Sequence, residues 1–477
     1  MARTSLTRII FFLLCLLLFS FSCTTARYTS QRFQTIAVDR LLPSRLCDST
    51  TEGTHNDVEG NSVLQLIDRR GPCSPFNATA GRLIHDLRQD QSRVDWINSR
   101  ISSSSSPNTS QKEDLLLTDA ATRLPAYRGT SLGSGNFIVN VALGTPKKDF
   151  SLVFDTGSDL TWVQCSPCLT YCYQQQGPRF APSASSTYKS IPCSAQECDE
   201  AALESGVGGC STSSNICIYG MLYGDRSMSV GYLSRDTLTL SKNDILPSFT
   251  FGCGHRNMGL FGMTGGILGL GRGKLSVLSQ AGQKYSSIFS YCLPTSGAVG
   301  YLAFGPDSMS YTSVRFTPLL AGYKLYHLSI TGMSVGGRLL PISASMFARS
   351  GAIIDSGTVI TRLPPAIYAA LRSAVRTVMA KYKLTVPLEI LDTCYDLSEY
   401  STVDYPPIAF HFQGGAELAL DASNIFYTRS LEQVCLAFAA NINEQSFSII
   451  GNWQQKKTLV VHDIAHSRIG FKPNACA

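Results

Sequence analysis

Two aspartates of this chain stand in the same local setting, directly after an apolar run and directly before a hydroxyl residue and a glycine. Asp155 opens Asp-Thr-Gly-Ser, and Asp355 opens Asp-Ser-Gly-Thr 200 residues later. Either tetrapeptide alone is most often a turn or a helix cap, but the repeat indicates a duplicated unit with one carboxyl per copy. Two carboxyls held together can act on water, because one accepts its proton while the other hydrogen-bonds a carbonyl group.

A second repeat supports the duplication. Ile-Leu-Gly at 267–269 ends 114 residues after Asp155, and Ile-Ile-Gly at 449–451 ends 96 residues after Asp355. With this order in both halves, the chain from Phe137 to the C-terminus resembles the pepsin-like aspartic proteases. The resemblance implies an all-β fold with few helices, a bilobal double β-barrel with the active-site cleft between its lobes.

The resemblance makes Asp155 and Asp355 a catalytic dyad that hydrolyses peptide bonds at acidic pH. Like charges forced together cannot both ionise, so the pair shares one proton and titrates with separated pKa values, as is known for this family. Either aspartate can carry the proton, and the acid and base roles are expected to exchange during the cycle. No cofactor and no metal ion are expected.

Six neighbours of the two aspartates have supporting roles implied by the resemblance, and they come in three pairs. Ser158 and Thr358 hydrogen-bond the outer carboxylate oxygens. Thr156 and Ser356 tie the two loops together across a pseudo-twofold axis. Gly157 and Gly357 let backbone amides approach closely.

A hairpin that closes over substrate, the flap, is implied at Tyr223-Gly224-Asp225. Trp162 lies where family members have the tryptophan that holds the flap tyrosine. Taken singly, Tyr223 and Trp162 would be ordinary core aromatics, and only their register to the first aspartate suggests this role. Arg226 stands where a small residue is expected, so the resemblance does not extend to flap mobility or to charge preference near the scissile bond.

The N-terminus has the layout of a secretory signal peptide. Arg3 and Arg8 precede an apolar stretch at 9–21, and small residues follow at 22–26. A membrane span takes about 20 apolar residues, so a retained anchor is the weaker alternative. The C-terminus has no apolar tail for a lipid anchor. We therefore expect a protein of the secretory pathway without a membrane anchor, in the apoplast or alternatively in the vacuole or a plastid.

The chain has 16 cysteines, and an even dozen in the catalytic region is expected to form disulfides. Seven crowd between the first aspartate and the flap, where crosslinks would stabilise a loop that has little apolar core. Zinc binding by Cys165, Cys168 and Cys172 is the weaker alternative. This insert resembles that of the nepenthesin-like plant aspartic proteases. The pairing is left open, although Cys394 with Cys435 is plausible. The twelve are Cys165, Cys168, Cys172, Cys193, Cys198, Cys210, Cys217, Cys253, Cys292, Cys394, Cys435 and Cys476.

The segment from Arg27 to Leu124 is interpreted as a prosegment that keeps a precursor inactive. It contains glycosylation sequons at Asn77 and Asn108 and has no strand alternation. Its one ordered piece is predicted as a helix from Leu83 to Ile101, which docks on the enzyme while basic neighbours pair with the dyad. Cleavage is expected between Ser110 and Gly133.

The string at 66–75 resembles the prosegments of a nepenthesin-like subgroup that includes a chloroplast-nucleoid DNA-binding protease. No helical insertion of about a hundred residues follows Asp355, which also favours this atypical plant branch over the typical vacuolar enzymes.

The expected organisation is a signal peptide (1–26), a prosegment (27–124), an N-terminal lobe (125–315) with a Cys-rich insert (165–217), and a C-terminal lobe (316–477). About 350 residues are too many for one barrel and suit two lobes. Alternating apolar residues at 137–143 predict a half-buried strand, and Pro365 with the apolar residues that follow it to Val378 predicts one of few helices.

The net charge of +6 is dispersed, and Lys456-Lys457 is the longest basic run of the catalytic region. A nucleic-acid binder would have a basic stripe with interleaved aromatics, so nucleic acid is not an expected partner. The expected partners are protein and peptide substrates and the chain's own prosegment, on a monomeric enzyme.

Three alternative functions have less support from the sequence. A catalytically silent binding protein on the same fold, such as an inhibitor-binding or storage-type relative, typically lacks an aspartate, whereas both are present here. A serine hydrolase motif at 129–133 has no preceding strand and lies in the expected processing region. The seven histidines form no H-E-x-x-H motif for a zinc protease.

Overall fold

The computed structural model describes residues 33–48, 62–76, 83–103 and 137–476, with short breaks at 206, 212, 224–226, 243, 260, 282–283, 296 and 307–310. The expected signal peptide, the sequons at Asn77 and Asn108, the expected processing region, and Gly224 and Asp225 of the flap lie outside these residues. Over the described part of the chain, no helix combines the length and the apolar character needed to cross a bilayer.

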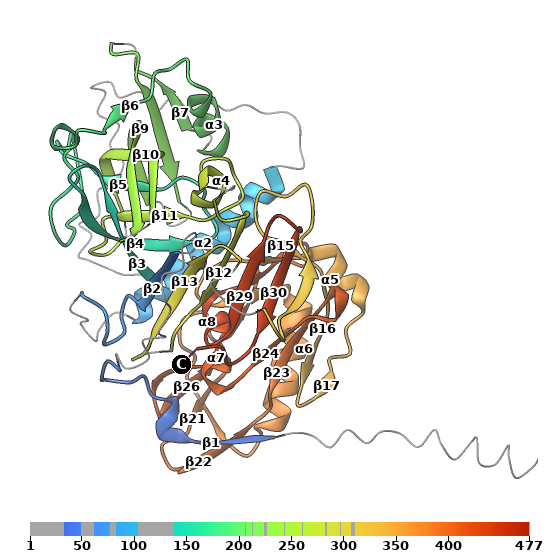
Figure 1. Ribbon diagram of the computed structural model, residues 1–477. Coiled ribbons are helices and arrows are strands. Elements are labelled where there is room, and N and C mark those ends of the chain that lie inside the picture. Colours follow the sequence, from blue (N-terminus) through green and yellow to red (C-terminus); the bar gives the residue numbers. More distant parts are fainter. Residues whose placement is uncertain are drawn as a thin grey trace, which may run out of the picture.

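The chain forms two β-rich lobes that share a large sheet, and helix α2 (Leu83–Ser103) runs between them (Figure 1). The predicted all-β, bilobal fold is therefore confirmed. The strands of the shared sheet follow the order β14 (Arg315–Pro318), β30 (Arg468–Lys472), β29 (Leu459–Asp463), β12 (Ile288–Cys292), β13 (Val299–Phe304), β2 (Ser62–Asp68), β3 (Phe137–Leu143), β4 (Lys148–Asp155), β11 (Gly266–Gly269), β5 (Trp162–Gln164), β10 (Asp244–Met258), β9 (Met228–Ser241), β8 (Cys217–Leu222) and β7 (Val207–Cys210), with β6 (Lys189–Ser190) on β9.

Smaller sheets complete the C-terminal lobe. The first is β15 (His327–Leu328), β18 (Ala352–Ile354), β28 (Ser448–Ile450), β19 (Thr361–Leu363) and β27 (Phe438–Ala440). The second is β17 (Arg338–Leu339), β16 (Ile330–Val335), β23 (Ile408–Phe412) and β24 (Glu417–Leu420). The third is β20 (Lys383–Thr385), β21 (Cys394–Asp396), β26 (Gln433–Leu436) and β25 (Phe426–Ser430), and a two-stranded sheet joins β1 (Gln34–Ala37) to β22 (Thr402–Tyr405).

Short helices connect the strands. Besides α2, the α-helices are α3 (Gln196–Ser205), α4 (Val277–Ala281), α5 (Ala344–Ser350), α6 (Pro365–Val378), α7 (Ala422–Ile425) and α8 (Asn452–Gln455). The predicted helix at Pro365 is confirmed, because α6 starts at that proline and buries Ile367, Leu371 and Val375. Proline suits this position, since the first turn of a helix does not need its N–H group.

The predicted duplication is visible as two equivalent three-strand units. In the N-terminal lobe, β11 runs parallel to β4 and antiparallel to β5, which places Gly269 beside Asp155. In the C-terminal lobe, β28 runs parallel to β18 and antiparallel to β19 in the same way. Each apolar-apolar-Gly strand therefore packs beside the strand that carries the aspartate, and this fixes where the aspartate lies.

Strand β3 forms where the alternation predicts it, but the expectation that it is half-buried was wrong. Ile138 and Ala142, on the face expected to be exposed, are buried as well, and Asn140 is the exposed residue of the strand. The strand pairs with β2, β4 and β9, and the burial of residues on both of its faces shows that each face is covered by other parts of the protein. A strand covered on both faces tolerates apolar residues at every position.

The segment at 27–124, which is expected to be a prosegment, contains more order than the sequence predicted. The expectation of no strands was wrong, because β2 pairs with β13 and β3 inside the shared sheet and β1 pairs with β22. A disulfide joins Cys47, which lies between β1 and β2 in the sequence, to Cys73, which follows β2. All three pairing partners lie outside this segment, so its local pattern does not reveal the strands.

The expected disulfides are present among the described residues, and the predicted pair Cys394–Cys435 is confirmed. These two cysteines face each other across β21 and β26. The other pairs of the catalytic region are Cys165–Cys253, Cys168–Cys172, Cys193–Cys210, Cys198–Cys217 and Cys292–Cys476. Since Cys165, Cys168 and Cys172 are all crosslinked, the zinc alternative for that run is excluded.

Candidate active site

The two aspartates meet at the junction of the lobes, each at the end of a buried strand. Asp155 closes β4 and Asp355 follows β18, and each is only 1% exposed. Ser158 donates a hydrogen bond of 2.6 Å to Oδ2 of Asp155, and Thr358 donates one of 2.6 Å to Oδ2 of Asp355. The hydrogen bonds expected to the outer oxygens are therefore present and equal in the two lobes.

The two loops are tied to each other by a reciprocal pair of hydrogen bonds. The backbone N–H of Thr156 donates to Oγ of Ser356 at 3.0 Å, and the N–H of Ser356 donates to Oγ1 of Thr156 at 2.9 Å. These bonds cross the pseudo-twofold axis as expected. They fix the two carboxyls relative to each other, because each loop supplies both a donor and an acceptor.

Glycine is required beside each aspartate because the loops approach closely. A Cβ added to Gly157 would lie 2.6 Å from Oδ1 of Asp355, and one added to Gly357 would lie 2.5 Å from Oδ1 of Asp155. Each glycine N–H also donates to the inner oxygen of its own aspartate, at 3.0 Å and 3.2 Å. A side chain at either position would force the loops apart.

Arg93 of α2 lies directly on the dyad. Its Nη2 donates to Oδ1 of Asp155 at 2.8 Å and to Oδ1 of Asp355 at 2.9 Å, and its Nε donates to Oδ2 of Asp355 at 2.9 Å. One nitrogen thus bridges the inner oxygens of the two carboxyls. The helix predicted in the prosegment is confirmed, and Arg93 is the basic residue that contacts the dyad.

Arg93 changes the titration of the site. Burial alone would raise the pKa of the Asp355 carboxyl, but the charge and hydrogen bonds of Arg93, with those of Thr358 and Gly357, together hold that pKa below its usual value. Burial likewise acts to lower the pKa of Arg93, and the two aspartates outweigh it and raise that pKa. With α2 in place, the charged form of Asp355 is therefore stabilised.

One turn before Arg93, Asp90 makes a second buried contact. Its carboxylate accepts hydrogen bonds from the backbone N–H groups of Val359 at 2.6 Å and Ile360 at 3.1 Å. Its Oδ2 lies 3.0 Å from Nη2 of Arg362, and both side chains of this ion pair are 0% exposed. Burial raises the pKa of Asp90, against the opposing effects of Arg362 and the two N–H groups. A buried ion pair of this kind depends on α2 being docked.

The apolar face of α2 packs against the C-terminal lobe. Leu87 joins a buried cluster with Val359 and Ile360, and Val94 and Ile97 join another with Ile353 and Ile449. Because Ile353 precedes Asp355 by two residues, the helix covers the surface beside the dyad. Arg88 forms an additional ion pair with Glu389 at the exposed edge, at 2.9 Å.

The expected partner of the flap tyrosine is present. Nε1 of Trp162 donates to the hydroxyl of Tyr223 at 2.7 Å, and both side chains are buried. The rings of Trp162 and Tyr223 each contact that of Phe261 edge to face, with centroids 4.9 Å and 5.6 Å away. This cluster holds Tyr223 at the base of the segment where the flap is expected.

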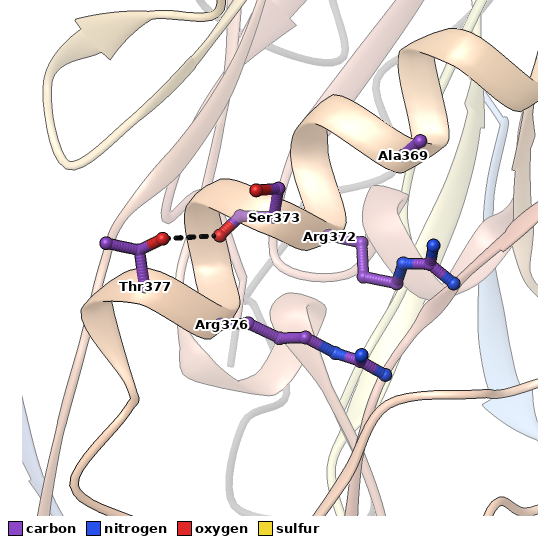
Figure 2. Close-up of a pocket in the computed structure, with 5 residues that line it drawn as sticks. All are labelled: Ala369, Arg372, Ser373, Arg376 and Thr377. Carbon is purple, nitrogen blue, oxygen red and sulfur yellow. Dashed lines mark hydrogen bonds between the residues drawn. The ribbon is translucent and has the colours of Figure 1, made fainter.

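A shallow pocket on α6 is separate from this site. Figure 2 shows Arg372 and Arg376 extending side by side from the helix, while Thr377 turns away to donate a hydrogen bond to the carbonyl oxygen of Ser373. Arg372 is already paired with Asp392, and Arg376 donates to Oγ1 of Thr393. Within the described ranges, no group of three or more His, Cys, Asp or Glu side chains forms a metal site.

Arg362 and its partner Asp90 were not predicted from the sequence as residues of the site. Arg362 lies 200 residues after Trp162, which is the offset between the two aspartates, so the duplication itself marks it as the C-terminal counterpart of Trp162. Asp90 lies three residues before Arg93, where a helix places both on one face.

The comparisons with known proteins agree with this geometry. The family model described as xylanase inhibitor N-terminal matches residues 137–306, and the one described as xylanase inhibitor C-terminal matches residues 325–473. The chain is 44% identical over 448 residues to the aspartyl protease AED1 of Arabidopsis thaliana, covering 93% of this chain and 92% of the relative. It is 34% identical over 446 residues to the aspartic proteinase nepenthesin-2 of Nepenthes gracilis, covering 90% and 94%.

The fold is shared with solved plant proteins of distant sequence. The crystal structure of edgp matches with a TM-score of 0.58 at 20% identity, covering 71% of this chain and 92% of that one. Basic 7S globulin from soybean matches with a TM-score of 0.57 at 19% identity, covering 72% and 95%. The chain belongs to the pepsin-like aspartyl protease family, among plant members that include the nepenthesins.

Proposed function

We propose that this protein is an aspartic endopeptidase that hydrolyses peptide bonds at acidic pH and is made as an inactive precursor. The observation that carries the proposal is the position of Arg93, whose Nη2 bridges the inner oxygens of Asp155 and Asp355. Two carboxyls that share one donor atom in this way are close enough to share one proton when the arginine is absent.

In the proposed reaction, the free dyad holds one proton between Asp155 and Asp355. The ionised carboxylate takes a proton from water, and the oxygen of that water forms a bond to the scissile carbonyl carbon while the protonated carboxyl donates to the carbonyl oxygen. In the second half, a carboxyl gives a proton to the amide nitrogen and the C–N bond breaks. The serine and threonine donors on the outer oxygens hold both carboxyls in place throughout.

The precursor is inactive because α2 occupies the surface that substrate needs. An extended peptide would bind as an added strand between the lobes, and Arg93 and Val94 lie where such a peptide would reach the dyad. The shared-sheet position of β2 gives the prosegment a second attachment. Activation therefore requires both cleavage of the chain and departure of α2.

The test is an assay of the purified, acid-processed protein on denatured globin across acidic and neutral pH, with and without a statine-type inhibitor. Asp155→Ala and Asp355→Asn should each abolish cleavage, while Asp149→Asn, an exposed carboxyl on the same strand as Asp155, should not. Full activity in either dyad variant would refute the proposal.

A second candidate is a protein-binding role without catalysis. The matching family models carry the description of xylanase inhibitor halves, which supports this alternative. It is the weaker proposal because both aspartates and all six supporting residues are in place. A folded, processed protein that cleaves no peptide would favour it.

The remaining parts of the proposal concern location and partners. A signal-peptide layout and abundant disulfides support a secretory route, with the extracellular space as the destination and the vacuole or a plastid as alternatives. The proposed partners are protein substrates and the prosegment, for a monomer without a membrane anchor that does not bind nucleic acid.

A further inference from the structure

Asp90 is held by a site that is built for a carboxylate. Two adjacent backbone N–H groups, of Val359 and Ile360, donate to its two different oxygens, and the Arg362 guanidinium lies 3.0 Å from one of them. Arg362 is fixed in turn by a hydrogen bond from its Nη1 to the carbonyl oxygen of Ile360 at 2.7 Å. Two N–H donors and one guanidinium charge from one short stretch thus converge on one anion.

The negative charges that face Arg362 come from α2. Asp90 and Asp95, the two acidic groups that act on the pKa of Arg362, both lie on that helix, and burial lowers this pKa against their effect. Gln91, also on α2, accepts a hydrogen bond from Nε of Arg362 at 3.4 Å. When α2 leaves, the guanidinium therefore loses these partners while its tie to Ile360 stays within the catalytic lobe.

This site lies beside the dyad. Val359 follows Asp355 by four residues, and Asp90 and Arg93 are three residues apart on one helix, so they contact neighbouring points of the surface. The contacts of Asp90 and Arg93 in α2 show that one chain segment can reach this site and the dyad at the same time.

We propose that Val359, Ile360 and Arg362 form a subsite that selects an aspartate or glutamate side chain in the substrate. In the precursor, Asp90 occupies this subsite as a stand-in for the substrate carboxylate. The inference rests on the proposed peptidase activity and adds to it the substrate class, namely peptides with an acidic residue near the scissile bond.

The test is a positional peptide library cleaved by the acid-processed wild type, by Arg362→Met and by Arg362→Lys. Wild type should prefer Asp or Glu over Asn or Gln at one position by about 10- to 100-fold in kcat/KM, since a charged donor would otherwise be left unpaired. Arg362→Met should lose this preference, so that the ratio of kcat/KM for acidic to amide peptides falls to about one, and Arg362→Lys should restore part of it. Arg338→Met, at an exposed arginine of the same lobe, is the matched control.

The preference should also depend on pH in a defined direction. Below about pH 4 the substrate carboxyl becomes neutral, so discrimination between Glu and Gln should shrink as pH falls. A wild type with equal rates on acidic and amide peptides at pH 5 would overturn the proposal, whether or not the Arg362 variants fold.

A binding measurement separates this proposal from the proposed activity. A labelled peptide of residues 83–103 should bind the processed protein, and Asp90→Asn in that peptide should weaken binding at least tenfold to wild type but not to Arg362→Met. This result without any peptide cleavage would refute the activity and retain the carboxylate site. Cleavage without acidic preference, and with no effect of Asp90→Asn, would refute the site and retain the activity.

Discussion

Trp162 and Arg362 occupy equivalent positions in the two lobes and do different work. Trp162 pairs in register with Ile267, and Arg362 with Ile449, each on the strand beside an aspartate. Both side chains are fully buried. Trp162 donates to Tyr223 within its own lobe, whereas Arg362 lies against Asp90 of α2.

The backbone around these two residues has kept its symmetry. Oγ1 of Thr161 accepts from the N–H of Gly269 at 3.0 Å, and Oγ1 of Thr361 accepts from the N–H of Gly451 at 3.0 Å. The different partners of Trp162 and Arg362 show that the duplicated scaffold fixes the two carboxyls, while the side chain after each threonine can have a different role in each lobe. In the N-terminal lobe, Trp162 donates a hydrogen bond to Tyr223. In the C-terminal lobe, Arg362 forms an ion pair with the Asp90 carboxylate.

The strongest test of the shared scaffold is to remove one carboxyl from each lobe. Asp155→Asn and Asp355→Asn should each lower kcat by about 10³-fold or more, because the dyad needs both groups for acid and base catalysis. The measurement is kcat on one peptide at the optimal pH. A loss of kcat in only one of the two variants would show that the two aspartates are equivalent in structure but not in catalysis.

Removing the cation from α2 should have the next largest effect. Arg93→Met leaves two buried carboxyls without a cationic partner, so docking of α2 should weaken by about 100-fold and processing should occur at higher pH than in wild type. The measurement is the pH of half-processing, followed by gel and by activity. Arg88→Met on the same helix breaks only a surface pair with Glu389 and should leave that pH unchanged.

The pH dependence of this release follows from the dyad. With α2 docked, the pKa of Asp355 is depressed; with α2 gone, the two carboxyls share a proton and one pKa rises. Release therefore takes up a proton, and α2 is held most firmly above the higher of these pKa values. The dissociation constant of α2, measured with a labelled 83–103 peptide, should rise by about tenfold for each pH unit of acidification between the pKa of the docked state and the raised pKa of the free dyad. A constant affinity over this range would contradict the ion pair as the restraint.

The smallest effect is expected in the N-terminal lobe. Tyr223→Phe removes the hydroxyl that accepts from Trp162, at a cost of about 1 kcal/mol, so kcat/KM on neutral peptides should fall by about fivefold. The variant should leave the preference for acidic peptides unchanged, in contrast to Arg362→Met. If Tyr223→Phe altered that preference, the assignment of separate roles to Trp162 and Arg362 would be wrong.

The sequence was sufficient to predict the parts that the duplication repeats. Asp155 and Asp355 were predicted from their repeated setting, their supporting pairs from the family resemblance, and the helices at 83–101 and 365–378 from apolar periodicity. It was insufficient for β1 and β2, whose pairing partners β22, β13 and β3 all lie outside the segment that contains them. The pair of Asp90 and Arg362 was missed for the same reason, since a long-range contact leaves no local pattern. The buried second face of β3 depends on neighbours that only the folded sheet supplies.

The most direct test of the central claim is the pH profile of kcat/KM for the processed wild type on a neutral peptide. The shared proton predicts a bell in the acidic range, with two separated apparent pKa values that both disappear when either aspartate is replaced. A profile with one pKa, or activity that rises only toward alkaline pH, would contradict a dyad formed by Asp155 and Asp355.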